Sequence, residues 1–111
     1  MALGFAANGT LLLTASQQDL FAQVATPKLY ACLVHLEDMV ASDIIEIRVF
    51  VHDQADNAER QYSITTYNNV QTSPSQLFDF VPSQKYRLSA VQTADGAGGK
   101  KTISWERVEV S

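Results

Sequence analysis

The chain is poor in the residues from which catalytic and metal sites are usually built. It has one cysteine and two histidines among 111 residues. A single cysteine excludes an intrachain disulfide, so the fold must be stabilised by packing. Cys32 lies in a mostly apolar run from Leu29 to Leu36, where a free cysteine usually acts as a small buried hydrophobe. We therefore expect a core without covalent cross-links and a cysteine that is not reactive.

Basic residues are also few. The chain has 8 lysines and arginines against 12 acidic residues, for a formal net charge of -4, and its only adjacent basic pair is Lys100 and Lys101. Affinity for a phosphate backbone comes mainly from clustered lysine and arginine. The charge balance therefore argues against direct binding to nucleic acid.

Long hydrophobic runs are lacking as well. No stretch is apolar for long enough to span a bilayer, and no basic residue precedes the apolar residues that follow Met1. We expect neither a secretory signal nor a membrane anchor, no membrane partner, and synthesis in the cytoplasm.

Catalytic motifs are not recognisable. No Gly-x-Ser-x-Gly turn presents a nucleophile, and the glycine-rich stretch from Asp95 to Gly99 precedes an expected strand, whereas phosphate-binding loops lead into a helix. A hairpin is the simpler interpretation of that stretch. His35, Glu37 and Asp38, with Asp43 and His52 on a neighbouring strand, have residue types that bind zinc or iron, but their spacing matches no specific motif. We expect no enzyme, no catalytic residue, no metal and no cofactor.

What the sequence does contain is apolar and polar residues that alternate with a period of two, separated by gaps rich in Gly, Pro, Asn and Asp. This pattern is typical of half-buried β-strands. The expected strands are residues 10–14, 19–24, 28–37, 43–53, 60–67, 77–81, 85–93 and 100–110. The fold class is therefore all-β, a single domain over residues 1–111 that forms an antiparallel β-sandwich, jelly-roll-like with seven to eight strands. Seven strands would also fit an immunoglobulin-like sandwich.

The clearest alternation runs from Asp43 to Asp53. It places Ile45, Ile47, Val49 and Val51 on one face, which we expect to be core. A β-hairpin with residues 60–67 follows naturally. Because proline cannot donate a ladder hydrogen bond, Pro74 and Pro82 should confine the strand between them to a sheet edge or make it short.

Faces opposite the expected core also carry apolar residues, which are Leu29, Leu33, Ile44, Phe50 and Val91. Large exposed apolar patches are uncommon on soluble monomers, and burial between identical subunits would cover them. We expect a homodimer or homotrimer with Leu29, Leu33, Ile44 and Phe50 at its interface.

A different use of aromatic residues is also open. Trp105 with Tyr62, Tyr67 and Tyr86 could form a platform for a sugar ring, although strand aromatics are more often core or interface.

Several strand and turn segments form a recognisable series along the chain. They are Asp43-Ile-Ile-Glu-Ile-Arg-Val-Phe-Val51, Tyr62 and Tyr67, Asn69-Val-Gln-Thr-Ser-Pro74, Val81-Pro-Ser83, Tyr86-Arg-Leu-Ser-Ala-Val-Gln-Thr93, the glycine-rich loop and Ile103-Ser-Trp105. Over residues 28–108, this arrangement resembles small virion proteins of tailed bacteriophages, in particular head decoration proteins, also called capsid cement. The resemblance implies an oligomeric β-sandwich on the capsid surface of the virion. The implied function is mechanical, because such a protein stabilises the head by bridging major capsid subunits.

In this interpretation, contacts with the major capsid protein come from the segments least committed to the core. Residues 1–8 would form an N-terminal arm anchored by Leu3 and Phe5, the loop at residues 54–58 would form a second contact, and the glycine-rich loop would contribute Asp95, Lys100 and Lys101. The alternatives are a carbohydrate-binding or host-adhesion module of a phage tail, or a small metalloenzyme in which His35 and His52 converge.

Overall fold

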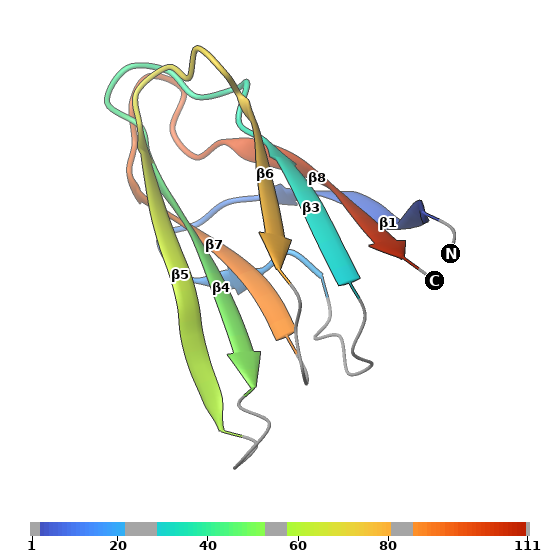
Figure 1. Ribbon diagram of the computed structural model, residues 1–111. Helices are drawn as coiled ribbons and strands as arrows, with labels where there is room; N and C mark the ends of the chain where they lie inside the picture. The colour runs from blue at the N-terminus through green and yellow to red at the C-terminus, as the bar shows by residue number, and fades with distance from the viewer. Residues whose placement is uncertain (1–2, 22–28, 53–57, 81–85, 111) are drawn as a thin grey trace.

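Eight β-strands and no helix make up the described part of the chain. The computed structural model describes residues 3–21, 29–52, 58–80 and 86–110 (Figure 1). The strands are β1 (Leu3–Leu12), β2 (Gln18–Asp19), β3 (Leu29–His35), β4 (Ile44–His52), β5 (Glu59–Asn68), β6 (Ser75–Phe80), β7 (Tyr86–Ala94) and β8 (Thr102–Val110). Among the described residues, no helix is long and apolar enough to cross a membrane.

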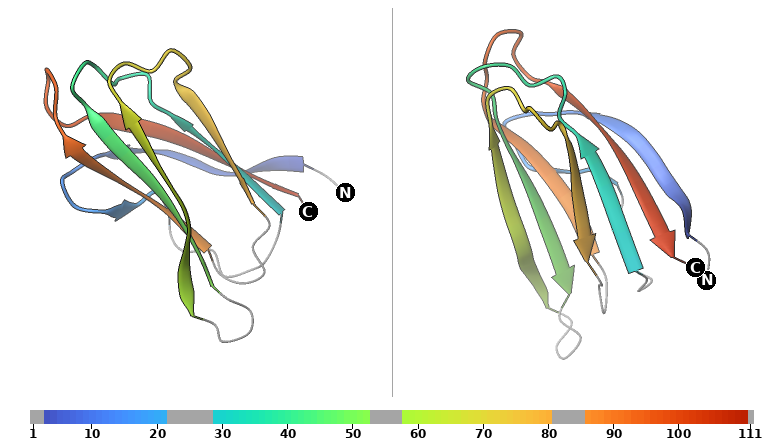
Figure 2. Two further views of the ribbon diagram at one scale, coloured as in Figure 1. Left: turned by 60° about the vertical axis from the view of Figure 1, so that its left-hand side comes forward. Right: turned by 45° about the horizontal axis from the view of Figure 1, so that its top comes forward.

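The strands form two antiparallel four-stranded sheets, in the orders β1-β8-β3-β6 (sheet A) and β2-β7-β4-β5 (sheet B). The pairs β1–β8, β2–β7, β3–β6 and β4–β5 are those of one long hairpin whose second half returns along its first. Rolling that hairpin up adds the β3–β8 and β4–β7 pairs and splits it into two layers (Figure 2). This strand order is a jelly roll, so the expected all-β sandwich is confirmed and the seven-stranded alternative is wrong.

Most expected strands lie where the alternation placed them, and two differ. The strand expected at residues 10–14 begins at Leu3 and ends at Leu12, because its pairing with β8 extends from Leu3 opposite Val110 to Leu12 opposite Thr102. The strand expected at residues 19–24 is the two-residue β2, and residues 22–24 lie outside the described residues.

The connection from β7 to β8 is not the expected hairpin. β7 pairs with β2 and β4 in sheet B, whereas β8 pairs with β1 and β3 in sheet A. Residues 95–101, called the β7–β8 loop below, therefore cross from one sheet to the other. The two flanking strands looked like hairpin partners because alternation reveals a strand but not its neighbour.

The core follows the predicted alternation. Ile45, Ile47 and Val49 of β4 are fully buried between the sheets, while the residues between them are partly exposed. Each such aliphatic side chain contributes about 1.5–3 kcal/mol by leaving water. Cys32 is buried in the same core, and burial raises the pKa of its thiol to about 12, which is the inert state expected from the sequence.

Candidate interaction surfaces

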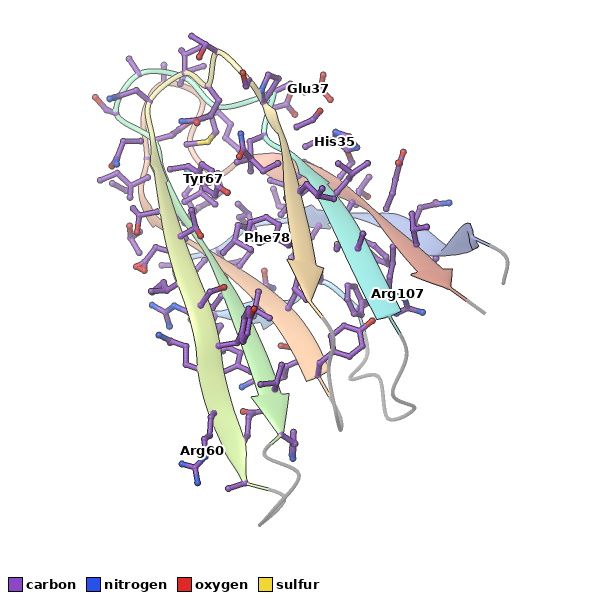
Figure 3. All side chains as sticks on the ribbon, in the orientation of Figure 1. His35, Glu37, Arg60, Tyr67, Phe78 and Arg107 are labelled. Atoms are coloured by element: carbon purple, nitrogen blue, oxygen red, sulfur yellow. The ribbon has the colours of Figure 1, made fainter. Side chains whose placement is uncertain are left out.

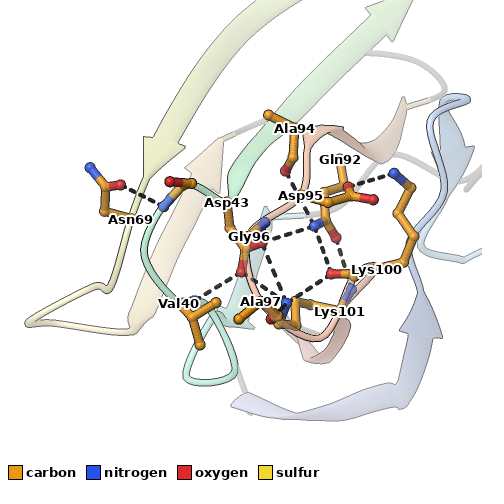
Figure 4. Close-up of polar contacts among 12 residues, drawn as sticks. Val40, Asp43, Asn69, Gln92, Ala94, Asp95, Gly96, Ala97, Lys100 and Lys101 are labelled. Atoms are coloured by element: carbon orange, nitrogen blue, oxygen red, sulfur yellow. Dashed lines mark hydrogen bonds and ion pairs between the residues drawn. The ribbon is translucent and has the colours of Figure 1, made fainter.

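The β7–β8 loop is tied to the end of the sandwich by two fully buried polar side chains, Asp43 just before β4 and Gln92 in β7 (Figure 4). Asp43 Oδ1 accepts a 2.6 Å hydrogen bond from the amide of Gly96, and Asp43 Oδ2 lies 3.2 Å from Lys101 Nζ. Gln92 Oε1 accepts the amide of Lys101 at 2.8 Å. These contacts hold the loop against the segment that precedes β4.

The donors of the same cluster satisfy the carbonyl groups of the loop. Lys101 Nζ donates to the carbonyl oxygens of Ala97 and Gly99, at 2.8 Å in both cases. Gln92 Nε2 donates to the carbonyl oxygens of Ala94 and Gly99, at 3.3 and 3.2 Å. Because buried polar groups are costly when unpaired, these bonds explain how polar side chains persist at this depth.

Glycine is required at two kinds of position in the loop. A Cβ on Gly96 would lie 2.0 Å from the carbonyl oxygen of Ala41, so no side chain fits without a shift of the backbone. Gly98 and Gly99 have φ values of 87° and 74°, in the left-handed region that favours glycine. The glycine-rich composition thus serves a close crossing between sheets.

The charge of Asp43 is maintained despite its burial. Burial alone would raise the pKa of the Asp43 carboxyl, but hydrogen bonds from the amides of Val40 and Gly96 and the nearby Lys101 ammonium outweigh that effect and lower the pKa below its usual range. Asp43 is therefore an ionised anchor of the fold.

The three loop residues predicted to bind a partner fall into two groups. Asp95 and Lys100 form a 2.5 Å ion pair with both side chains about one-third exposed. The Lys101 side chain is only 11% exposed and its ammonium is held by Asp43. The partner-binding role of all three remains a prediction, and only Asp95 and Lys100 present accessible charge.

The predicted N-terminal arm is, from Leu3 onward, part of a sheet. Leu3 pairs with Val110 and Phe5 with Val108 at the edge of sheet A, while residues 1–2 and the side chains of residues 3–6 lie outside the described residues. Any partner contact by Leu3 and Phe5 would therefore start from an edge strand. Of the predicted contact loop at residues 54–58, all but Ala58 lies outside the described residues.

The predicted self-association residues are spread over the outer faces of both sheets. Leu33 is partly buried on sheet A, opposite Leu77, which is 59% exposed. Ile44 and Phe50 are partly buried on sheet B, and the Arg87 guanidinium lies 4.2 Å from the centre of the Phe50 ring. The Leu29 side chain lies outside the described residues.

Val91, which was also expected on a face opposite the core, is buried in β7, opposite Glu46 of β4.

The outer face of sheet B is bridged by ion pairs. Arg87 lies 2.8 Å from both Asp19 and Glu59, and Arg48 lies 3.0 Å from Glu46. Hydrogen bonding from Arg87 lowers the pKa of Glu59 despite the opposing effect of burial. Most charge on this face is thus neutralised within the chain.

The outer face of sheet A carries a polar pocket of about 370 Å³ near the ends of β1, β3 and β8. Its lining comprises Thr10, His35, Glu37, Asp38, Thr102, Ile103 and Ser104. His35 and Glu37 lie together at this end of the molecule (Figure 3). His35 Nδ1 is 2.8 Å from Ser75 Oγ, and His35 Nε2 is 3.9 Å from Glu106.

Of the five residues whose types could bind a metal, the structure brings together His35, Glu37 and Asp38 but not Asp43 or His52. Asp43 belongs to the buried network, and His52 ends β4 in the other sheet, 3.6 Å from Glu59. His35 ends β3 and His52 ends β4, at opposite ends of the sandwich (Figure 1). No group of three potential metal ligands occurs among the described residues. The convergence of His35 and His52 required by the metalloenzyme alternative is therefore wrong.

The aromatic platform suggested by the sequence is also wrong. Trp105, Tyr67 and Tyr86 are buried on the inner faces of the sheets, and only Tyr62 is exposed. The Phe21 ring lies 5.0 Å from Trp105 and 6.0 Å from Tyr86, so the aromatic side chains pack with one another in the interior.

No family model matches this chain, and no curated protein matches it by sequence. Among solved structures, the chain is similar to a structure of the Gx strain of infectious bursal disease virus, with a TM-score of 0.53 and 14% identity over 98% of this chain and 31% of the other. A crystal structure of the VP2 subviral particle of the same virus aligns with a TM-score of 0.45 and 12% identity, over 98% of this chain and 32% of the other. The chain thus spans about a third of these viral chains, and the first similarity shows the shared fold.

Proposed function

We propose that this protein is a structural component of a virion, and that it acts as a capsid decoration or cement protein. Copies of the chain associate into a homodimer or homotrimer on the capsid surface and bridge neighbouring major capsid subunits. It has no catalytic role and no cofactor in this proposal.

The observation that carries the proposal is the jelly-roll strand order. Eight-stranded jelly rolls recur in viral capsids, lectins and cupins. The similarity to a viral structure is one of fold, and it favours the first of these classes. The phage-like strand and turn segments from residue 28 to residue 108 favour the decoration role among virion proteins.

Stabilisation in this proposal comes from repeated weak contacts. Each copy would contribute a small surface, with Asp95 and Lys100 of the β7–β8 loop and the β1 edge as the candidate contacts. An oligomer that binds two or more capsid subunits at once gains avidity, because the second contact forms at a high effective concentration. The bridges oppose separation of the subunits under internal pressure.

The test is to assemble capsid particles from the corresponding major capsid protein with and without this chain. Co-sedimentation with particles and a higher temperature of particle disruption support the proposal. Failure to bind particles, with the protein folded by circular dichroism, contradicts it.

A carbohydrate-binding or host-adhesion role is the second candidate, favoured by the pocket on sheet A. The pocket has a volume in the range of small-ligand sites, and hydroxyl and carboxylate groups line it. Binding to a glycan array that is lost in Glu37→Gln would favour this role over capsid cement.

A further inference from the structure

Two sheets in a sandwich leave four edge strands, and in this protein the edges differ. β1 and β6 border sheet A, and β2 and β5 border sheet B. An edge strand presents backbone N–H and C=O groups that can pair with another strand, so natural proteins protect edges by shortening, prolines, bulges or charges.

Three of the edges are protected. β2 has only two residues, and β6 has six residues between Pro74 and Pro82. β1 contains two glycines and a register shift between Phe5 and Ala7. Each of these features limits regular pairing with a further strand.

β5 is ten residues long and has little such protection. The stretch from Gln61 to Tyr67 contains no charged residue, no proline and no glycine, and it is rich in β-branched and aromatic residues. A register shift lies at Tyr62, but pairing with β4 is regular from Ser63 to Asn68. Tyr62 and Ile64 are 59% and 46% exposed on this strand.

The sequence of β5 is compatible with a second copy of itself in only one orientation. Its charged residues, Glu59 and Arg60, both lie at one end of the strand. Parallel pairing would place each of these charges beside its own copy, whereas antiparallel pairing separates them to opposite ends of the ribbon. A two-fold axis near Ile64, perpendicular to the sheet, places Ile64 of each copy opposite Ile64 of the other, with Tyr62 opposite Thr66 on the same face.

We propose that β5 pairs antiparallel with β5 of a second copy, so that two B sheets join into one eight-stranded sheet across a two-fold axis. The occupant of this edge is thus a copy of the same chain. The inference deepens the proposed function, since it names the surface for self-association, and it replaces the scattered outer-face residues with one strand.

The experiment uses the isolated protein, so its outcome is independent of any particle. Light scattering at increasing concentration should give a mass rising towards twice the 12.2 kDa of one chain. Ile64→Glu should return the mass to that of a monomer, because two carboxylates would meet at the joined edge. Ile64 lies opposite Arg48, so a glutamate there is compatible with the folded chain.

The matched controls are Leu12→Glu on β1 and Leu77→Glu on β6, residues that are 60% and 59% exposed on other edge strands. Both should leave the dimer intact. As a second readout, amide exchange from Ser63 to Tyr67 should slow several-fold with concentration in the wild type and not in Ile64→Glu.

Three results would overturn the inference. One is a monomer at the highest soluble concentration. Another is a dimer that persists in Ile64→Glu and is lost in Leu12→Glu or Leu77→Glu. The third is a dimer in which amide exchange from Ser63 to Tyr67 does not slow with concentration, which would assign self-association to another surface.

Discussion

Two lysine–aspartate pairs at the β7–β8 loop use the same chemistry in opposite ways. Lys100 and Lys101 are neighbours in sequence, and each lies close to an aspartate. The buried pair, Lys101 with Asp43, is nearly inaccessible, whereas the exposed pair, Lys100 with Asp95, is about one-third exposed. The buried pair is therefore part of the fold, whereas the exposed pair is available to a partner.

The difference matters for energetics because solvent screens the exposed pair. Exposed ion pairs contribute about 0–1 kcal/mol, whereas removal of one member of a buried pair costs about 3–5 kcal/mol. Substitutions in the buried pair are therefore expected to lower the free energy of unfolding clearly more than substitutions in the exposed pair.

The largest effect is expected for Asp43→Asn. The substitution removes the charge opposite Lys101 and places an amide donor among the amide donors of Val40 and Gly96. We expect the free energy of unfolding to fall by about 3–5 kcal/mol, measured by urea denaturation. A loss below about 1 kcal/mol would show that the buried pair contributes no more to stability than the exposed pair.

A smaller loss is expected for Gly96→Ala. The new Cβ would lie 2.0 Å from the carbonyl oxygen of Ala41, so the loop or its neighbour must move, at a cost of about 1–3 kcal/mol. Gly99→Ala is the matched control, because nothing lies within 4 Å of its Cβ position and only the φ of 74° opposes the change. The control should cost about 1 kcal/mol. Equal losses for the two variants would contradict the close crossing at Gly96.

Acid should weaken the buried pair of Asp43 and Lys101. The pKa of Asp43 is lower in the folded protein than its ordinary value of about 3.9, so the unfolded chain binds the proton more tightly. The stabilisation is therefore present above about pH 4 and is lost as the pH falls through the folded pKa. Urea denaturation between neutral pH and this window should show a smaller decline for Asp43→Asn than for the wild type. Identical declines would show that Asp43 does not contribute.

Asp95→Asn is expected to have the smallest effect. It removes the negative charge that pairs with Lys100, and we expect the free energy of unfolding to change by about 0–1 kcal/mol. In the particle assay, the same variant should reduce co-sedimentation if the exposed pair contacts the capsid. Full stability with unchanged particle binding would remove Asp95 from the contact surface.

Much of the fold could be predicted from alternation. Ile45, Ile47 and Val49 alternate with less buried residues over a long strand, and this local pattern directly reports which face is buried. Strand order could not be predicted, because β7 and β8 have hairpin-like spacing and yet belong to different sheets. Pairing depends on contacts between distant segments that one-dimensional periodicity does not contain.

The candidate site shows the same division. His35, Glu37 and Asp38 are close in sequence and could be grouped without a structure. Thr10, Thr102 and Ser104 complete the pocket from β1 and β8, because the jelly-roll order places β8 between β1 and β3. A sequence signal for the buried network did exist, because Gln92 continues the inward face of Leu88 and Ala90 with a polar residue. A polar residue at a core-facing position indicates a hydrogen-bonded partner in the interior.

The most direct test of the virion role is the copy number of this protein in gradient-purified virus particles from its source, measured by quantitative mass spectrometry against the major capsid protein. The proposal predicts a fixed ratio that is maintained through repeated purification. A protein abundant in the infected cell but absent from purified particles would contradict it.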